Sequence, residues 1–203
     1  MAEITAALVK ELRERTQAGM LDCRNALKET GGDLDAAATL LRERGIVKAQ
    51  RRVGRETGQG LVEAYLHRTG DFPPQVGVLV EVDCETDFVA KSDEMRQLAR
   101  ELAMHIAAAA PRWVAREDVP EDLVESERQL YRRKAEQDGR PADAIDKIVD
   151  GQLRKFFEES CLLEQPWVRE PKTPVKDLIA QTGATLQENV TVRRFSRFSI
   201  KEG

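Results

Sequence analysis

The chain has 203 residues, of which 41% are hydrophobic and 33% charged, and its formal net charge is -4. This is the composition of a globular protein that can bury a core. The acidic balance, without any basic run interleaved with aromatics, argues against nucleic acid as a direct partner. No apolar stretch approaches the roughly 18 residues of a membrane helix, and the charged N-terminus is unlike a signal peptide, so we expect no membrane partner.

Few residues in the chain are suited to metal or redox chemistry. Its three cysteines, Cys23, Cys84 and Cys161, lie far apart without a CxxC pair. This favours reduced thiols in a cytoplasm over a disulfide framework or a zinc site. No HExxH, GxSxG or GxGxxG motif occurs, and "GRETGQG" lacks the Lys-Ser ending of a phosphate loop. We therefore predict no cofactor and no bound metal.

The first part of the chain, residues 5–45, reads as three short helices. Thr5 is the expected N-cap of the first helix, and "QAGM" separates it from the second. The second helix ends at a glycine pair at positions 31 and 32, Asp33 caps the third, and Gly45 is expected to end it. These helices predict a small N-terminal module.

Residues 47–60, basic first and then glycine-rich, read as a linker with a helical start. Beyond it the hydrophobic period becomes two, and residues 61–67 and 75–82 predict an antiparallel hairpin. Ser92 is the expected N-cap of a long helix that Pro111 ends.

Two more helices are expected, from Glu121 to "QDGRP" and over residues 142–160, before an irregular crossing at "EQPWVREPKTP". The last segment, "NVTVRRFSRFSI", alternates with period two. Neither of its sides is purely apolar, which predicts an edge or interface strand. The order predicts an α+β fold, with a three-helix domain and basic linker over residues 1–54 and an α+β core over residues 55–203.

The stretch "VLVEVDCETDFVAKSDEM" combines an apolar strand with an acidic turn. Asp83, Glu85 and Asp87 would point the same way if the strand continued, and could then hold Mg²⁺. The alternative is a solvated strand end. Mutual repulsion of three carboxylates argues against a regular strand through Asp87.

Phe88, on this acidic turn, has two interpretations. It tucks under its own helix, or it is held out on a strand-to-helix corner as an anchor for another protein's pocket.

Other candidate residues are also open to more than one interpretation. His105 lies at the margin of the apolar face of its helix, where a half-buried structural histidine is the ordinary case. Met20 and Leu21 are adjacent, so both cannot face the small core; an exposed pair beside Arg13 would suit a partner surface. The basic tract Arg51-Arg52-Arg55 is interpreted as solvated linker, with nucleic-acid contact the weaker alternative.

Three segments carry a resemblance to a known family. "EVDCETDFVAK" and "LRERTQAGMLDCRNAL" resemble the two signature stretches of bacterial elongation factor Ts, and "ADAIDKIVDGQLRKFFEESCLLEQPWV" resembles that family's C-terminal region. The resemblance covers nearly the whole chain in family order. It implies an N-terminal three-helix ubiquitin-associated-like domain and an α+β core in which three-stranded antiparallel sheets pack with helices.

The resemblance also implies guanine nucleotide exchange on elongation factor Tu, with release of GDP so that GTP can bind. It assigns Thr86, Asp87, Phe88 and Val89 to the partner's GTPase domain near the bound magnesium, with Phe88 entering a pocket between helices.

By the same resemblance, Arg13, Met20 and Leu21 match N-terminal positions that contact that domain. His105 matches a core position near the wedge, the name used here for Thr86, Asp87, Phe88 and Val89.

The chain departs from the family pattern at four places, Gln17, Leu21, Arg24 and Asp83, which affects the N-terminal contact more than the Phe88 corner. It is also short and holds one copy of a core subdomain that longer members duplicate. Because short members tend to pair two chains, "NVTVRRFSRFSI" is the predicted strand of a non-covalent homodimer.

Two other function classes remain open at the level of sequence. One is a binding adaptor that uses the three-helix module, with the core as scaffold. The other is a metal-dependent hydrolase that uses Asp83, Glu85 and Asp87.

Overall fold

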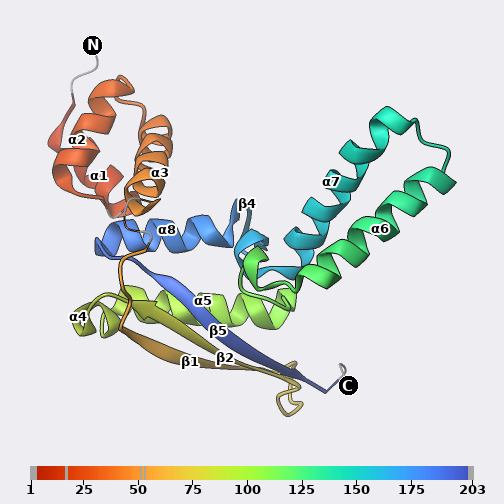
Figure 1. Cartoon of the computed structure of the whole chain (residues 1–203). Helices are drawn as coiled ribbons and strands as arrows, with labels where there is room; N and C mark the ends of the chain where they lie inside the picture. Colours follow the sequence, from red (N-terminus) through yellow and green to blue (C-terminus); the bar gives the residue numbers. More distant parts are fainter. Residues whose placement is uncertain (1–3, 17, 51, 53, 201–203) are drawn as a thin grey trace. The chain divides into compact units, whose positions relative to one another are not determined.

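The computed structural model describes residues 4–16, 18–50, 52 and 54–200 (Figure 1). Gln17 and Arg51, which the sequence analysis singled out, lie outside the described residues. The chain divides into two compact units, each assembled from three segments: Met1–Gly60 with Asp83–Met95 and Ile179–Thr191, and Leu61–Val82 with Arg96–Leu178 and Val192–Gly203.

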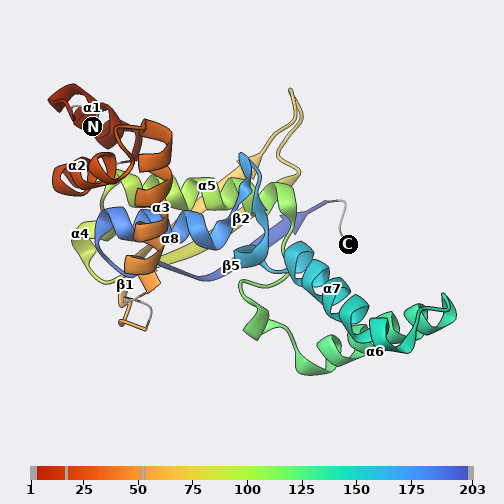
Figure 2. The ribbon, with the colours of Figure 1, turned by 90° about the horizontal axis from the view of Figure 1, so that it is seen from above.

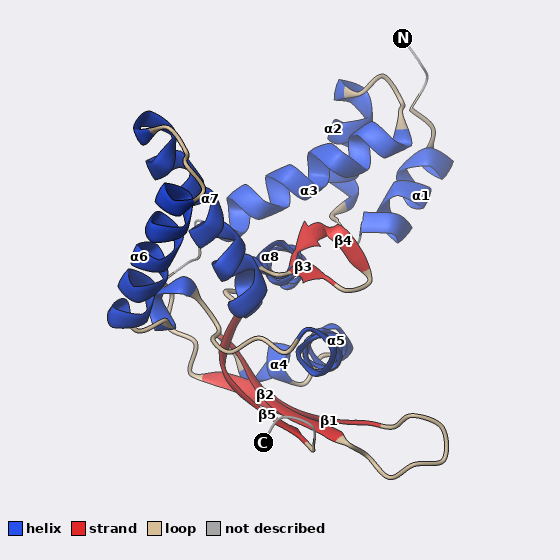
Figure 3. Cartoon of the chain, turned by 90° about the vertical axis from the view of Figure 1, so that its right-hand side faces the viewer, coloured by secondary structure: helices blue, strands red, loops and turns tan. Residues whose placement is uncertain are grey.

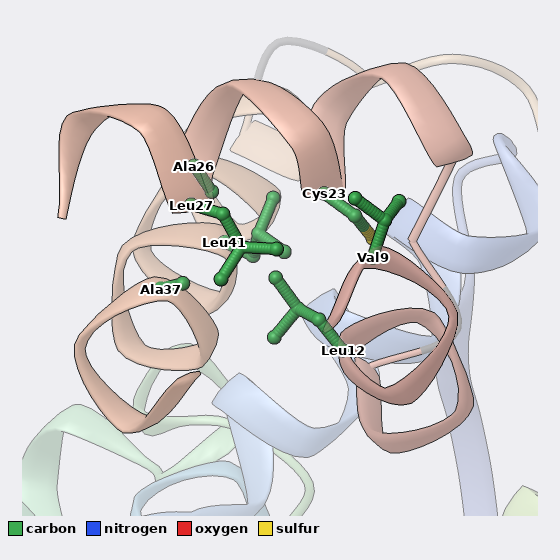
Figure 4. Packing of buried hydrophobic residues seen from close by; sticks show 7 residues of the cluster. All are labelled: Val9, Leu12, Cys23, Ala26, Leu27, Ala37 and Leu41. Atoms are coloured by element: carbon green, nitrogen blue, oxygen red, sulfur yellow. The ribbon is translucent and has the colours of Figure 1, made fainter. Parts of the chain in front are cut away.

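The first unit contains the three predicted N-terminal helices, α1 (Ala6–Thr16), α2 (Met20–Glu29) and α3 (Leu34–Gln50). Their local start signals act as expected, because the Thr5 hydroxyl accepts a hydrogen bond from the Leu8 amide and the Asp33 carboxylate accepts from the amides of Asp35 and Ala36. Seven buried side chains from all three helices point toward one another in Figure 4: Val9, Leu12, Cys23, Ala26, Leu27, Ala37 and Leu41.

The predicted end of the third helix at Gly45 is wrong, because α3 continues to Gln50. A glycine inside a helix costs only about 1 kcal/mol relative to alanine, and neighbouring helix formers can offset that cost. A Cβ atom at Gly45 would lie 3.5 Å from the Cβ of Ala184, so this glycine sits where α3 passes close to α8 (Val175–Leu186).

The sheet contains three strands in the order β1 (Gln59–His67), β2 (Val76–Cys84) and β5 (Thr191–Ser199). The predicted hairpin joins β1 and β2, and β5 lies at an edge as predicted. Two contacts show that β5 runs antiparallel to β2: the Ile200 amide donates to the Gln75 carbonyl, and Arg194 pairs with Glu81. The α+β fold class is confirmed.

The helix α5 (Asp93–Ala109) covers one face of this sheet (Figure 3). Its predicted N-cap is present, since the Met95 amide donates to the Ser92 hydroxyl at 3.2 Å. The covered face of β2 carries Val78, Val80 and Val82, all buried, while Leu79 between them is half exposed. One face of the sheet is therefore core and the other is open within this unit.

The two other predicted helices, α6 (Glu121–Gln137) and α7 (Ala142–Ser160), lie side by side in Figures 1 and 2. A small cluster of buried residues from both helices joins them: Ala135, Ile145, Val149 and Leu153. Short 3-10 helices precede α6 (Arg116–Asp118) and follow α7 (Leu162–Glu164).

The segment predicted to be irregular after α7 contains a two-stranded antiparallel ribbon, β3 (Pro166–Trp167) and β4 (Glu170–Pro174). The prediction of an irregular segment is wrong, because prolines at these positions do not prevent strand pairing. Pro166 and Pro174 face each other at the end of the ribbon, where a missing amide donor breaks little of the ladder.

Candidate functional site

The candidate site is the corner between β2 and α5. The strand β2 ends at Cys84, and a four-residue helix, α4 (Asp87–Ala90), follows before α5. Thr86 caps α4, because its hydroxyl accepts a hydrogen bond from the Val89 amide at 3.4 Å. The sequence predicts a corner here but not α4, since four residues are too few to show a helical period.

Phe88 is the second residue of α4, and 82% of its surface is exposed. The interpretation in which it tucks under its own helix is therefore wrong. An aromatic ring exposed to this degree has little packing within its own chain, and most of its apolar area is accessible from outside.

The three carboxylates beside Phe88 do not converge. Asp83 is buried, Glu85 pairs with Arg55 at 3.5 Å, and Asp87 pairs with Lys91 at 2.6 Å. The solvated strand end is also wrong for Asp83. Within the part of the chain that the structure describes, no three His, Cys, Asp or Glu side chains lie close enough together to hold a metal ion.

Asp87 is the charged residue that accompanies Phe88 at the surface. The hydrogen bond from Lys91 lowers the pKa of the Asp87 carboxyl below its ordinary value, which further favours the ionised form. The two side chains are four residues apart, the spacing at which helical neighbours meet. The exposed apolar ring of Phe88 therefore follows a residue that is engaged in a surface ion pair.

Behind the corner, Cys84 is buried and its thiol donates to the Thr86 carbonyl at 3.2 Å. Burial raises the pKa of this thiol, and the nearby Glu188 carboxylate adds to the effect. Cys84 is therefore a protonated structural thiol; it and the other two cysteines are all buried and unpaired.

The residues that hold the corner come from the far end of the chain, and nothing in the sequence predicts their contacts. The Glu188 carboxylate accepts hydrogen bonds from the amides of Glu85 and Thr86, and the Asn189 amide donates to the Glu85 carboxylate. Glu188 and Asn189 lie more than a hundred positions from their partners in sequence, so no local pattern could reveal these contacts.

The N-terminal candidates lie on the three-helix module. Met20 is 51% exposed, Leu21 is 69% exposed, and Arg13 is exposed on α1. Two adjacent helical residues point about 100° apart, and Cys23, Ala26 and Leu27 occupy the inward side of α2. Neither Met20 nor Leu21 faces the core of the module, so the exposed pair that the sequence allowed is confirmed.

His105 lies in the interior of α5 with none of its surface exposed, not half-buried as predicted. The Val168 amide donates to its Nδ1 at 3.3 Å, so the ring proton is on Nε2 and is donated to the Gln165 side-chain oxygen at 2.9 Å. Burial lowers the pKa of His105. Any effect of this residue on partner binding would act through the fold and not through direct contact.

A family model described as elongation factor Ts matches residues 4–202. The chain is 50% identical to "Elongation factor Ts" of Carboxydothermus hydrogenoformans, over 98% of this chain and 90% of that protein. It is also 50% identical to the protein of that name from Coprothermobacter proteolyticus (98% and 100% covered) and 49% identical to that of Desulfosudis oleivorans (100% of both).

Among the described helices, none is long and apolar enough to cross a membrane. A family match over almost the whole chain, relatives of about half identity and the α+β fold all agree. This chain belongs to the elongation factor Ts family.

Proposed function

We propose that this chain releases GDP from elongation factor Tu by presenting Phe88, with Thr86, Asp87 and Val89 around it, to the GTPase near its bound magnesium. Membership of the elongation factor Ts family supports the general role, nucleotide exchange on elongation factor Tu in translation elongation. The observation that carries the specific route is the 82% exposure of Phe88 on a braced corner.

The energetics require that Phe88 acts together with a wider interface. A nanomolar complex of GDP with its GTPase corresponds to about 12 kcal/mol. Burying one phenylalanine contributes about 1.5–3 kcal/mol, so the ring alone cannot displace the nucleotide. An interface of about 1,600 Å² can supply the rest.

The route is therefore linkage between two ligands of one GTPase. The nucleotide-free form accepts Phe88 and its surroundings better than the GDP form does. Thermodynamic reciprocity then requires that any factor by which this chain weakens GDP is the factor by which GDP weakens this chain. No covalent bond is made or broken, so the chain promotes release without being a chemical enzyme.

Magnesium is an efficient target for this linkage, because the cation neutralises phosphate charge in a site of low dielectric. Asp87 is an anion that its Lys91 partner keeps ionised beside Phe88. We expect Asp87 to engage polar groups near the magnesium while Phe88 occupies the adjoining pocket. Displacing the cation weakens the hold on GDP without direct contact between this chain and the nucleotide.

The test is stopped-flow release of a fluorescent GDP from elongation factor Tu. The wild-type chain should accelerate release in the presence of Mg²⁺. The acceleration should shrink after the cation is removed with a chelator, because the chelator has then already displaced the Mg²⁺ that the chain would displace. An equal acceleration with and without Mg²⁺ would contradict the magnesium route.

The exposed pair Met20 and Leu21, with Arg13, is proposed as a second contact with the same GTPase domain. Leu21→Ser should leave folding intact, because this side chain is 69% exposed. It should raise the concentration at which GDP release is half-maximal and leave the maximal rate unchanged. If the chain is instead an adaptor that binds only through the three-helix module, Leu21→Ser abolishes binding while Phe88→Ala leaves it intact.

The homodimer is proposed through the open face of the sheet, including β5. Five exposed apolar side chains lie on this face or just after β5: Val62, Leu66, Leu79, Phe198 and Ile200. An apolar area of this kind is typical of a protein interface. Phe198→Ser should shift the chain toward monomer in sedimentation equilibrium, and Phe72→Ser, which alters an exposed ring on the hairpin turn, should not.

A further inference from the structure

We propose that Glu188 is a positioning residue for Phe88, which fixes the corner of residues 84–88 in the conformation that presents the ring. The inference rests on the proposed function, since it concerns the same site. Glu188 does not contact the partner in this proposal. It acts through the backbone amides of Glu85 and Thr86 and through the Thr86 hydroxyl, which lie just before Phe88 in the chain.

The Glu188 carboxylate makes three contacts with the corner. One oxygen accepts hydrogen bonds from the amides of Glu85 at 2.9 Å and Thr86 at 3.1 Å, and the other accepts from the Thr86 hydroxyl at 2.5 Å. Both amides lie between the end of β2 and the start of α4, where neither ladder nor helix supplies an acceptor. Hydrogen bonds to a charged acceptor are stronger than those to a neutral one.

The end of α8 places Glu188 in this position. Gln187 has a left-handed backbone with φ of 61°, and the Glu188 amide donates to the Gly183 carbonyl at 3.1 Å, as in a Schellman motif. The chain returns so closely that a Cβ atom on Gly183 would lie 2.9 Å from the Glu188 carbonyl oxygen. The location of Glu188 is therefore set by backbone geometry.

A second set of hydrogen bonds joins the same two segments with the roles of donor and acceptor exchanged. The Glu85 carboxylate accepts from the Asn189 amide at 2.6 Å, and the Asn189 side-chain amide donates to the Arg55 carbonyl at 3.0 Å. Each of the two segments thus holds the backbone of the other with a glutamate. Such reciprocal bonding restricts rotation of the corner more than either contact alone.

The consequence for Phe88 follows through Thr86. Its hydroxyl donates to Glu188 and accepts from the Val89 amide, so Glu188 orients the group that caps α4. Phe88, 82% exposed, has little packing to hold it and depends on its backbone for direction. A ring that is fixed before docking loses less conformational entropy on binding.

The experiment compares Glu188→Ala and Glu188→Gln with a control, Glu158→Ala, which removes an exposed carboxylate on α7. The first readout is amide hydrogen exchange in the free chain. The Glu85 and Thr86 amides should exchange about tenfold faster in Glu188→Ala, the scale expected for bonds to a charged acceptor. Glu188→Gln keeps one acceptor oxygen and should lie between, and Glu158→Ala should match the wild type at both amides.

The second readout is GDP release from elongation factor Tu with single and double variants. Glu188→Ala should slow release in the wild-type background and add little in a Phe88→Ala background, because both changes act on one ring. Full additivity of the two losses, or unchanged amide exchange at Glu85 and Thr86, would overturn the inference.

The experiment can distinguish failure of the Phe88 proposal from failure of the Glu188 proposal. If Glu188→Ala does not fold, Glu188→Gln carries both readouts. If Phe88→Ala fails to slow release at all, the wedge proposal fails, and amide exchange in the free chain still decides whether Glu188 holds the corner.

Discussion

Phe88→Ala is the perturbation that separates presentation of the ring from support of the fold. Since 82% of the Phe88 surface is exposed, the free energy of unfolding of the variant should lie within about 0.5 kcal/mol of the wild-type value, as is usual for surface substitutions. In the complex it should lose the burial of one phenylalanine, about 1.5–3 kcal/mol. That loss corresponds to a stimulation of GDP release lower by about ten- to a hundredfold.

The assay is stopped-flow release of fluorescent GDP from elongation factor Tu, paired with urea unfolding of the free chain. Phe72→Ala is the matched control, because Phe72 is also an exposed phenylalanine, 67% exposed on the hairpin turn. It should change neither stability nor release. If Phe88→Ala unfolds the chain, or if the folded variant releases GDP as fast as the wild type, the assignment of Phe88 is wrong.

Two further predictions concern the fold around the site. Burial lowers the pKa of His105 from its ordinary 6.5, so the unfolded chain binds more protons near that pH than the folded chain does. The free energy of unfolding should therefore fall as the pH drops through and below 6.5. Urea unfolding should show that His105→Gln loses this part of the pH dependence. Gly183→Ala should lower the free energy of unfolding by about 1–2 kcal/mol. The added Cβ atom would lie only 2.9 Å from the Glu188 carbonyl oxygen, and this clash outweighs the gain in helix propensity. It should also slow GDP release by displacing Glu188. A thermal unfolding midpoint at or above that of the wild type would contradict the clash.

Local signals predicted much of the fold. The helix over residues 142–160 and the caps at Thr5, Asp33 and Ser92 each depend on neighbours within four residues, and all are present in the structure. The failures at Gly45 and at the β3–β4 ribbon have a different origin. The helix continues through Gly45 where α3 passes close to α8, which the α3 segment alone does not encode. The ribbon forms although it contains prolines, because Pro166 and Pro174 face each other at its end, where prolines are tolerated.

The strand-to-helix corner that carries Phe88 was predictable from the sequence, but the contacts that support it were not. Acidic residues before an exposed aromatic mark the corner in the sequence, and resemblance to the elongation factor Ts family directs attention to Phe88. The brace from Glu188 comes from the other end of the chain, 102 positions from Thr86. No periodicity or cap relates the two residues, so only the folded chain reveals that they meet.

The most direct test of the central claim follows the Phe88 ring itself. We would replace Phe88 with 4-fluorophenylalanine and record its ¹⁹F resonance in the free chain, with elongation factor Tu bound to GDP and Mg²⁺, and with nucleotide-free elongation factor Tu. The account predicts a solvent-exposed ring in the free chain and a ring shielded from a soluble paramagnetic agent in the nucleotide-free complex. A ring that stays exposed to the agent in that complex would contradict the claim that Phe88 enters the GTPase.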